Sequence, residues 1–105
     1  MMAYVYDANI LAGELGFDGK IYSFAYDEAF LTAKNSRAIS LTLPKQKEPF
    51  VSTYLHPFFA NLLAEGNLKK LQCKRLKIDE SDEFTRLLKT AMDDTIGTIT
   101  IREKI

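Results

Sequence analysis

Short runs of alternating apolar and polar residues, separated by turn residues, characterise the first quarter of the chain. Tyr22, Phe24 and Tyr26 fall on one side of such a run, and the Asp18-Gly19 pair before it favours a tight hairpin. The pattern predicts five strands, at residues 3–6, 10–15, 21–26, 39–43 and 96–101. Because only short turns join the first three, they are expected to form an antiparallel meander.

Apolar residues at helical spacing dominate the second half. The clearest stripe precedes the last predicted strand and consists of Phe84, Leu87, Leu88 and Ala91. The acidic run at residues 79–83 suits the start of that helix, where carboxylates meet the positive end of the helix dipole. Asp27 is placed to cap a short helix over residues 28–34.

Two further helices are predicted in the segment between residues 57 and 76. The first, over 57–65, begins at a proline and ends at Gly66, and it buries the cluster Phe58, Phe59, Leu62 and Leu63. Asn67 would cap the second helix, over 68–76, whose residues Leu68, Leu71 and Leu76 are expected to point inward.

Strands and helices are largely segregated along the chain, which is typical of an α+β fold. We therefore expect an antiparallel sheet, formed by the meander plus later strands, with three or four helices packed on one face. The length of 105 residues is close to the commonest domain size, so residues 1–105 are expected to form a single domain.

Composition narrows the range of functions and locations. The net charge is zero, with 14 basic and 14 acidic residues, which gives no general sign of a nucleic-acid or membrane-surface partner. The N-terminus has no signal-peptide pattern, and no apolar run is long enough to span a bilayer. One cysteine allows no internal disulfide, and a cytoplasmic location is expected.

The candidate chemical groups are better explained by structure than by catalysis. His56 and Cys73 are the only histidine and the only cysteine, and neither has a partner at catalytic or metal-ligand spacing. The chain also lacks the glycine-rich and nucleophile motifs of nucleotide-binding and hydrolytic enzymes. We therefore expect no enzyme activity, no cofactor and no metal site.

The basic run from Lys69 to Lys77 has three interpretations. A solvated helix face is favoured, because the acids at 79–83 offset its charge and no aromatic residues are interleaved with the basic ones. A charged surface that docks on another protein is the second interpretation. A nucleic-acid contact is the third.

Five segments, in order, resemble a known family: YVYDANILAGEL (Tyr4–Leu15), FDGKIYSFAYDEAFL (Phe17–Leu31), AISLTLP (Ala38–Pro44), HPFFANLLAEG (His56–Gly66) and DEFTRLLKTAMDDTIGTITI (Asp82–Ile101). They are similar to motifs of the N-terminal subdomain of HipA-type serine/threonine kinases, which are toxins of bacterial toxin–antitoxin systems. The fourth segment is the most specific, because the family pattern there is x-P-F-F-x-N-L-L-P-E-G. Ala64, Ala91 and Thr98 depart from the family pattern, which often has Pro, Gly and Ala at these positions.

The resemblance implies a function for a chain without a kinase body. In tripartite HipBST systems a small separate protein, HipS, resembles this subdomain, while the kinase HipT lacks it and HipB is a helix-turn-helix DNA-binding protein. HipS acts there as the antitoxin that binds and restrains HipT. The resemblance therefore implies a HipS-like antitoxin with a HipT-like kinase as partner, a HipB-like protein as a further member of the complex, and no direct contact with nucleic acid or membrane.

The expected kinase contact is the end of the fourth segment, where polar residues follow the apolar cluster: Glu65, Gly66, Asn67, Lys69 and Lys70. The charged loop 45–48 is the second choice. Two other functions stay open at this point. The chain could be a non-inhibitory structural subunit that completes a split kinase, or a nucleic-acid adaptor that uses the basic run.

Overall fold

The computed structural model describes residues 1–91 and 98–104, and within them one antiparallel sheet has the strand order β4-β3-β2-β1-β5. The strands are β1 (Met2–Asp7), β2 (Ile10–Phe17), β3 (Tyr22–Tyr26), β4 (Phe50–Ser52) and β5 (Ile99–Glu103). The helices are α1 (Glu28–Thr32), α2 (Pro57–Ala60), α3 (Gly66–Leu76) and α4 (Glu83–Thr90). The predicted α+β fold is confirmed.

The predicted meander of β1, β2 and β3 is present, and local sequence explains both of its turns. Ala8 and Asn9 have φ angles of 50° and 69°, as a two-residue hairpin turn requires. In the second turn the Asp18 carboxylate accepts hydrogen bonds from the backbone N–H groups of Lys20 and Ile21, at 2.9 and 2.7 Å. The register between β1 and β2 shifts at Val5, which marks a β-bulge.

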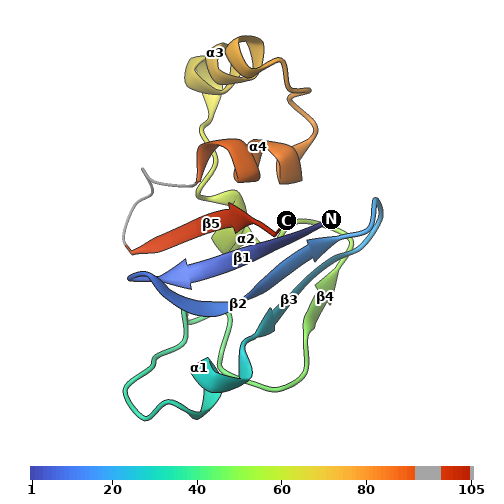
Figure 1. The fold of residues 1–105 in the computed structure, drawn as a ribbon. Coiled ribbons are helices and arrows are strands. Elements are labelled where there is room, and N and C mark those ends of the chain that lie inside the picture. Colours follow the sequence, from blue (N-terminus) through green and yellow to red (C-terminus); the bar gives the residue numbers. More distant parts are fainter. Residues whose placement is uncertain (92–97, 105) are drawn as a thin grey trace.

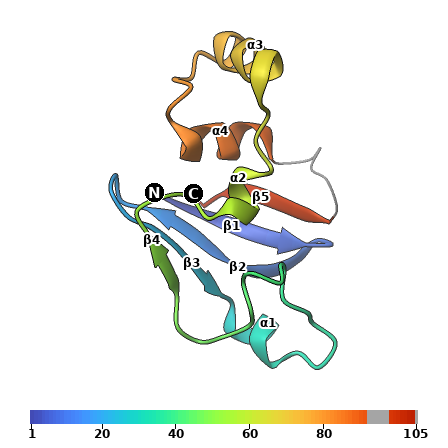
Figure 2. The same ribbon diagram turned by 180° about the vertical axis from the view of Figure 1, so that it is seen from behind.

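The core lies between the sheet and the helices. Phe59 of α2 is fully buried and its ring lies 5.4 Å from that of Phe24 in β3. Phe30 of α1 stacks on Tyr26, with ring centroids 5.8 Å apart. Figure 1 shows α4 next to the β5 edge and α1 at the opposite end of the sheet. From behind, α2 lies against the sheet, and the two termini lie side by side in both views (Figures 1 and 2).

Three of the predicted elements near the ends of the chain are confirmed. The Asp27 carboxylate caps α1 by accepting from the N–H of Ala29, and Asp82 caps α4 by accepting from that of Thr85. The stripe Phe84, Leu87, Leu88 and Ala91 is buried. β5 includes the second half of the predicted last strand, and residues 96 and 97 of that prediction lie outside the described residues. Asp93 and Asp94, which we expect to form a turn, also lie outside them.

The predicted strand over residues 39–43 is wrong. Ser40–Leu43 forms a turn, in which the Leu43 N–H donates to the Ser40 carbonyl at 3.1 Å, and Leu41 at its tip is fully exposed. The hydroxyl of Tyr26 hydrogen-bonds to the backbone at both ends of this turn, since it accepts from the N–H of Ile39 and donates to the Leu43 carbonyl. The fourth strand of the sheet is β4 instead, paired with β3.

The predicted boundary between the two central helices is also wrong. α2 ends at Ala60, five residues earlier than predicted, and turns follow it. Gly66, with φ of 61°, begins α3 rather than ending a helix, and Glu65 rather than Asn67 is the N-cap residue. A glycine fits at this first position of α3 because a residue without a Cβ adopts a positive φ at little cost.

The orientation of α3 differs from the prediction as well. Leu68, Leu71 and Leu76 were expected to face inward, but they are 55%, 57% and 43% exposed, and Cys73 is the buried residue of the helix. Both ribbon views explain this, because α3 lies beyond α4 and away from the sheet (Figures 1 and 2). No helix among the described residues is both long enough and apolar enough to cross a membrane.

Candidate protein-binding surface

The five residues predicted to contact a partner lie around the start of α3. Glu65 is extended, with φ of −122° and ψ of 167°, and its side chain makes no capping bond to the helix. An added Cβ on Gly66 would meet nothing within 4 Å, so this corner of the chain is open to solvent. Asn67 and Lys70 are exposed and Lys69 is half-buried. The polar groups therefore project from a defined helix start.

A cleft of about 330 Å³ lies at this corner, between the end of α2, the start of α3 and α4. Three of the predicted residues line it: Glu65, Gly66 and Lys69. Asn61 and Ala64 come from the segment after α2, and Glu83 and Arg86 come from α4. The structure thus brings part of the predicted set into one hollow, while Asn67 and Lys70 lie outside its lining.

Arg86 is the site residue that the sequence patterns did not indicate. It is only 5% exposed, and its Nη2 donates to the carbonyl of Ala64 at 2.8 Å. Its Nη1 also donates a hydrogen bond to the carbonyl of Glu80, at 3.4 Å. The guanidinium therefore ties the connections before α3 and after it to α4. Arg86 follows Phe84 by two residues and so falls on the opposite side of α4 from the apolar stripe, which is why the spacing gave no signal of its burial.

Charge and hydrogen bonding are what this cleft offers to a partner. Lys69 and Arg86 contribute positive charge, and Glu65 and Glu83 contribute negative charge. Such a set can form ion pairs and hydrogen bonds with polar groups of another protein.

His56 and Cys73 have structural positions, as expected. The Nδ1 atom of His56 accepts a hydrogen bond from the N–H of Phe58 at 3.0 Å, and the ring thereby caps α2. Cys73 is buried in α3. In the described ranges, 1–91 and 98–104, no group of three His, Cys, Asp or Glu residues is arranged to hold a metal ion.

The second-choice contact, the loop 45–48, is partly engaged in the fold. Lys45 donates from Nζ to the Ser36 carbonyl at 3.3 Å and lies 5.7 Å from the centre of the Phe30 ring. Lys47 and Glu48 are exposed. Only the second half of this loop is therefore available to a partner.

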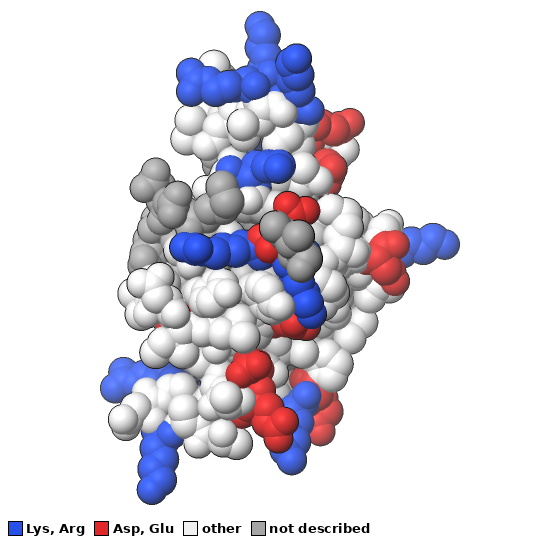
Figure 3. Space-filling model, in the orientation of Figure 1, with Lys and Arg blue, Asp and Glu red and all other residues white. Residues whose placement is uncertain are grey.

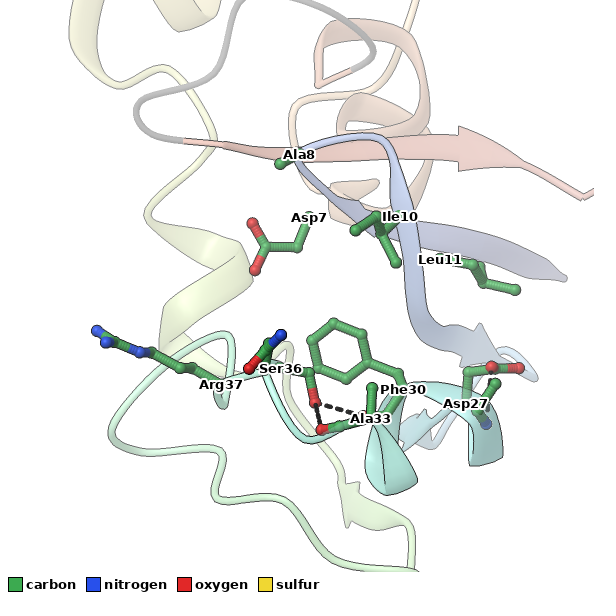
Figure 4. A pocket seen from close by; sticks show the side chains of 11 residues that line it. Asp7, Ala8, Ile10, Leu11, Asp27, Phe30, Ala33, Ser36 and Arg37 are labelled. Carbon is green, nitrogen blue, oxygen red and sulfur yellow. Dashed lines mark hydrogen bonds between the residues drawn. The ribbon is translucent and has the colours of Figure 1, made fainter.

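A pocket of about 520 Å³ lies between the β1–β2 turn and the segment that follows α1. In Figure 4 the Phe30 ring lies between Asp7 and Ile10 on one side and Ser36 on the other. Most of its lining is apolar, and in this view the charged groups of Asp7 and Arg37 lie toward the left and that of Asp27 toward the right. This pocket can receive an apolar side chain.

The sequence model of the HipA N-terminal domain matches residues 3–102. The chain belongs to the HipA N-terminal domain family. Its structure agrees with this assignment, because it superposes on the N-terminal domain of HipA toxin with a TM-score of 0.69 and 30% identity, over 99% of this chain and 94% of that one.

Two relatives show where this domain occurs. An uncharacterized protein of Haemophilus influenzae is 34% identical over 92 residues, which are 88% of this chain and 82% of the relative. The putative kinase Y4mE of Sinorhizobium fredii is 36% identical over 64 residues, which are 61% of this chain but 15% of the kinase. Segments similar to this chain therefore make up most of one relative and a minor part of the other.

Proposed function

We propose that this chain is a HipS-like antitoxin, which binds a HipT-like serine/threonine kinase and restrains it without catalysing a reaction itself. The observation that carries the proposal is the match of residues 3–102 to the HipA N-terminal domain. A domain that is one part of a toxin in HipA is well suited to bind a kinase body that lacks it. A HipB-like DNA-binding protein is the proposed third member of the complex.

The proposed contact surface is the start of α3, with Glu65, Gly66, Asn67, Lys69 and Lys70. Three of these residues line the cleft between α2, α3 and α4. Arg86 holds the backbone just before them, because its Nη2 donates to the Ala64 carbonyl. Occupation of the kinase surface by this corner would favour an inactive arrangement of the kinase, since a ligand stabilises the state that it binds better.

A non-inhibitory structural subunit is the alternative. The similarity to part of a putative kinase favours it, because that relative carries the matching segment within a longer chain. The two functions differ in cells. Co-expression with a HipT-like kinase from the same genome restores growth if the chain is an antitoxin, whereas a subunit that only completes the kinase leaves growth inhibited or worsens it.

The contact surface is tested by reversing three charges together, with Glu65→Lys, Lys69→Glu and Lys70→Glu. Since charged contacts at an interface govern both affinity and choice of partner, we expect the triple variant to lose copurification with the kinase and growth rescue. Unaltered binding by a folded triple variant would show that the surface lies elsewhere.

A matched control keeps the change in net charge constant. Glu28→Lys, Lys20→Glu and Lys34→Glu alter the same number and signs of exposed charges, near β3 and α1 rather than α3. This control is expected to bind and rescue like the unmodified chain. An equal loss in both variants would mean that overall charge, and not the α3 corner, determines binding.

A further inference from the structure

The leucines of α3 form an apolar surface that the described chain leaves uncovered. Leu68 and Leu71, three residues apart, lie on one face of the helix, and each exposes more than half of its side chain. Cys73 lies on another side of α3 and is the buried residue of this helix. The helix therefore buries a narrow strip and presents its larger apolar residues to solvent.

This surface belongs to a helix with defined ends. Lys77 adopts the left-handed conformation at the C-terminal end, and its N–H and that of Ile78 both donate to the Cys73 carbonyl. Such an arrangement satisfies one carbonyl group of the last turn and stops the helix. The leucines are thus held on an ordered element, which reduces the entropy lost when a partner binds.

Positive charge surrounds the leucines. Within α3 there are four basic residues and no acidic ones, and Lys74 and Arg75 are both exposed. Figure 3 shows Lys and Arg side chains gathered over α3 at the top of the molecule. A second copy of the same helix would bring these like charges together, which disfavours self-association through this face.

We propose that Leu68 and Leu71 dock on an apolar patch with an acidic rim on the kinase partner. The proposal rests on the proposed function and assigns to it a second contact, one face of α3, adjacent to the polar corner at Glu65–Lys70. The leucines supply burial of apolar area, and Lys74 and Arg75 pair with the acidic rim. This division of roles matches the apolar centre and polar margin of protein interfaces.

An anionic membrane surface is the competing occupant for a basic helix with exposed leucines. Helices that lie in the membrane interface separate a strongly charged face from an apolar face rich in Trp, Phe or Leu. In α3 this separation is weak, because Arg75 lies at i+4 from Leu71 and i+7 from Leu68, and the helix has no aromatic residue. The helix therefore favours a protein partner.

The test uses the full chain and a HipT-like kinase from the same genome. Leu68→Gln with Leu71→Gln removes the apolar contact while keeping good helix formers, and Lys74→Glu with Arg75→Glu reverses the charged margin. We expect each pair to weaken kinase binding at least about tenfold, because central interface residues commonly contribute this much. Binding of the unmodified chain should also weaken as NaCl rises from about 0.1 M to about 0.5 M.

Controls separate this proposal from the proposed function. Leu41→Gln changes a fully exposed leucine on a distant turn and should bind normally. If the unmodified chain binds no kinase, the proposed function fails and this contact with it. If the unmodified chain binds but the leucine pair variant binds equally well, the proposed function stands and this contact is wrong. Sedimentation of the unmodified chain with phosphatidylserine vesicles, lost in the leucine pair variant, would replace the kinase with a membrane as the occupant.

Discussion

Removal of the Tyr26 hydroxyl tests how the turn at Ser40–Leu43 is held. Tyr26→Phe keeps the buried ring, and with it the stacking on Phe30, but deletes the oxygen that joins β3 to this turn. The N–H of Ile39, 3.1 Å from that oxygen, and the carbonyl of Leu43 both lose their partner. The substitution therefore isolates two hydrogen bonds from the packing around them.

The size of the effect follows from burial. Leu43 is fully buried, so its carbonyl is shielded from water after the substitution, and an unsatisfied buried acceptor costs about 1–3 kcal/mol. Ile39 is half-buried, and water can reach part of this region. We expect the free energy of unfolding to fall by about 2 kcal/mol, which for a domain of this size lowers Tm by roughly 10 °C.

Urea denaturation followed by circular dichroism measures this change, with Tyr54→Phe as the control. Tyr54 is 65% exposed, so loss of its hydroxyl should alter the free energy of unfolding by less than about 0.5 kcal/mol. Equal and small losses in the two variants would refute the view that Tyr26 supplies the hydrogen bonds of the turn.

Two other predictions concern packing and pH. Gly13→Ala should destabilise the domain by about 3 kcal/mol or more, because the new Cβ would lie 2.3 Å from the Ala25 carbonyl oxygen. Gly16→Ala should lose clearly less stability, since its Cβ meets movable side-chain ends, with Met2 Sδ nearest at 2.8 Å. Thermal melts compare the two variants. Burial raises the pKa of Tyr26 above 10.0, so the folded state keeps a proton that the unfolded chain releases. The contribution of this group to the free energy of unfolding should therefore be constant below about pH 10 and fall as pH rises through the folded pKa. Denaturation at a series of alkaline pH values should show a shallower fall for Tyr26→Phe than for the unmodified chain. Parallel curves for the two proteins would contradict this.

Features determined by neighbouring residues were predictable from the sequence. The hairpin turns, the Asp27 and Asp82 caps and the stripe of α4 each depend on interactions within a few residues. The buried phenylalanines of the fourth motif segment were also placed correctly, with Phe59 in the core and Phe58 packed against it. In these cases the local pattern and the final packing agree.

Features determined by distant residues were not predictable in the same way. Alternation at residues 39–43 fits a strand, but the backbone of this segment bonds to the phenol of Tyr26, which no sequence pattern marks as an acceptor. The spacing of Leu68 and Leu71 fits a buried face, but it cannot say whether any element covers that face. Gly66 illustrates a third case, because a glycine with positive φ serves equally at the end of one helix and before the next.

The candidate site was partly predictable for the same reason. Polar residues after an apolar cluster correctly indicated an exposed corner, and three of the five residues share a cleft. The contribution of Arg86 depends on carbonyl groups at residues 64 and 80, which are brought to it by folding. Because Arg86 falls on the opposite side of α4 from the apolar stripe, the helical spacing alone would assign it to the exposed face.

Kinase activity measured against increasing amounts of this chain tests the central proposal most directly. Purified HipT-like kinase is incubated with ATP and the unmodified chain, and phosphate incorporation into the kinase and its substrate is followed. If the chain is an antitoxin, incorporation falls in proportion to added chain and is suppressed near equimolar amounts. Incorporation that stays constant or increases, while the two proteins copurify, would contradict inhibition and support the structural-subunit alternative.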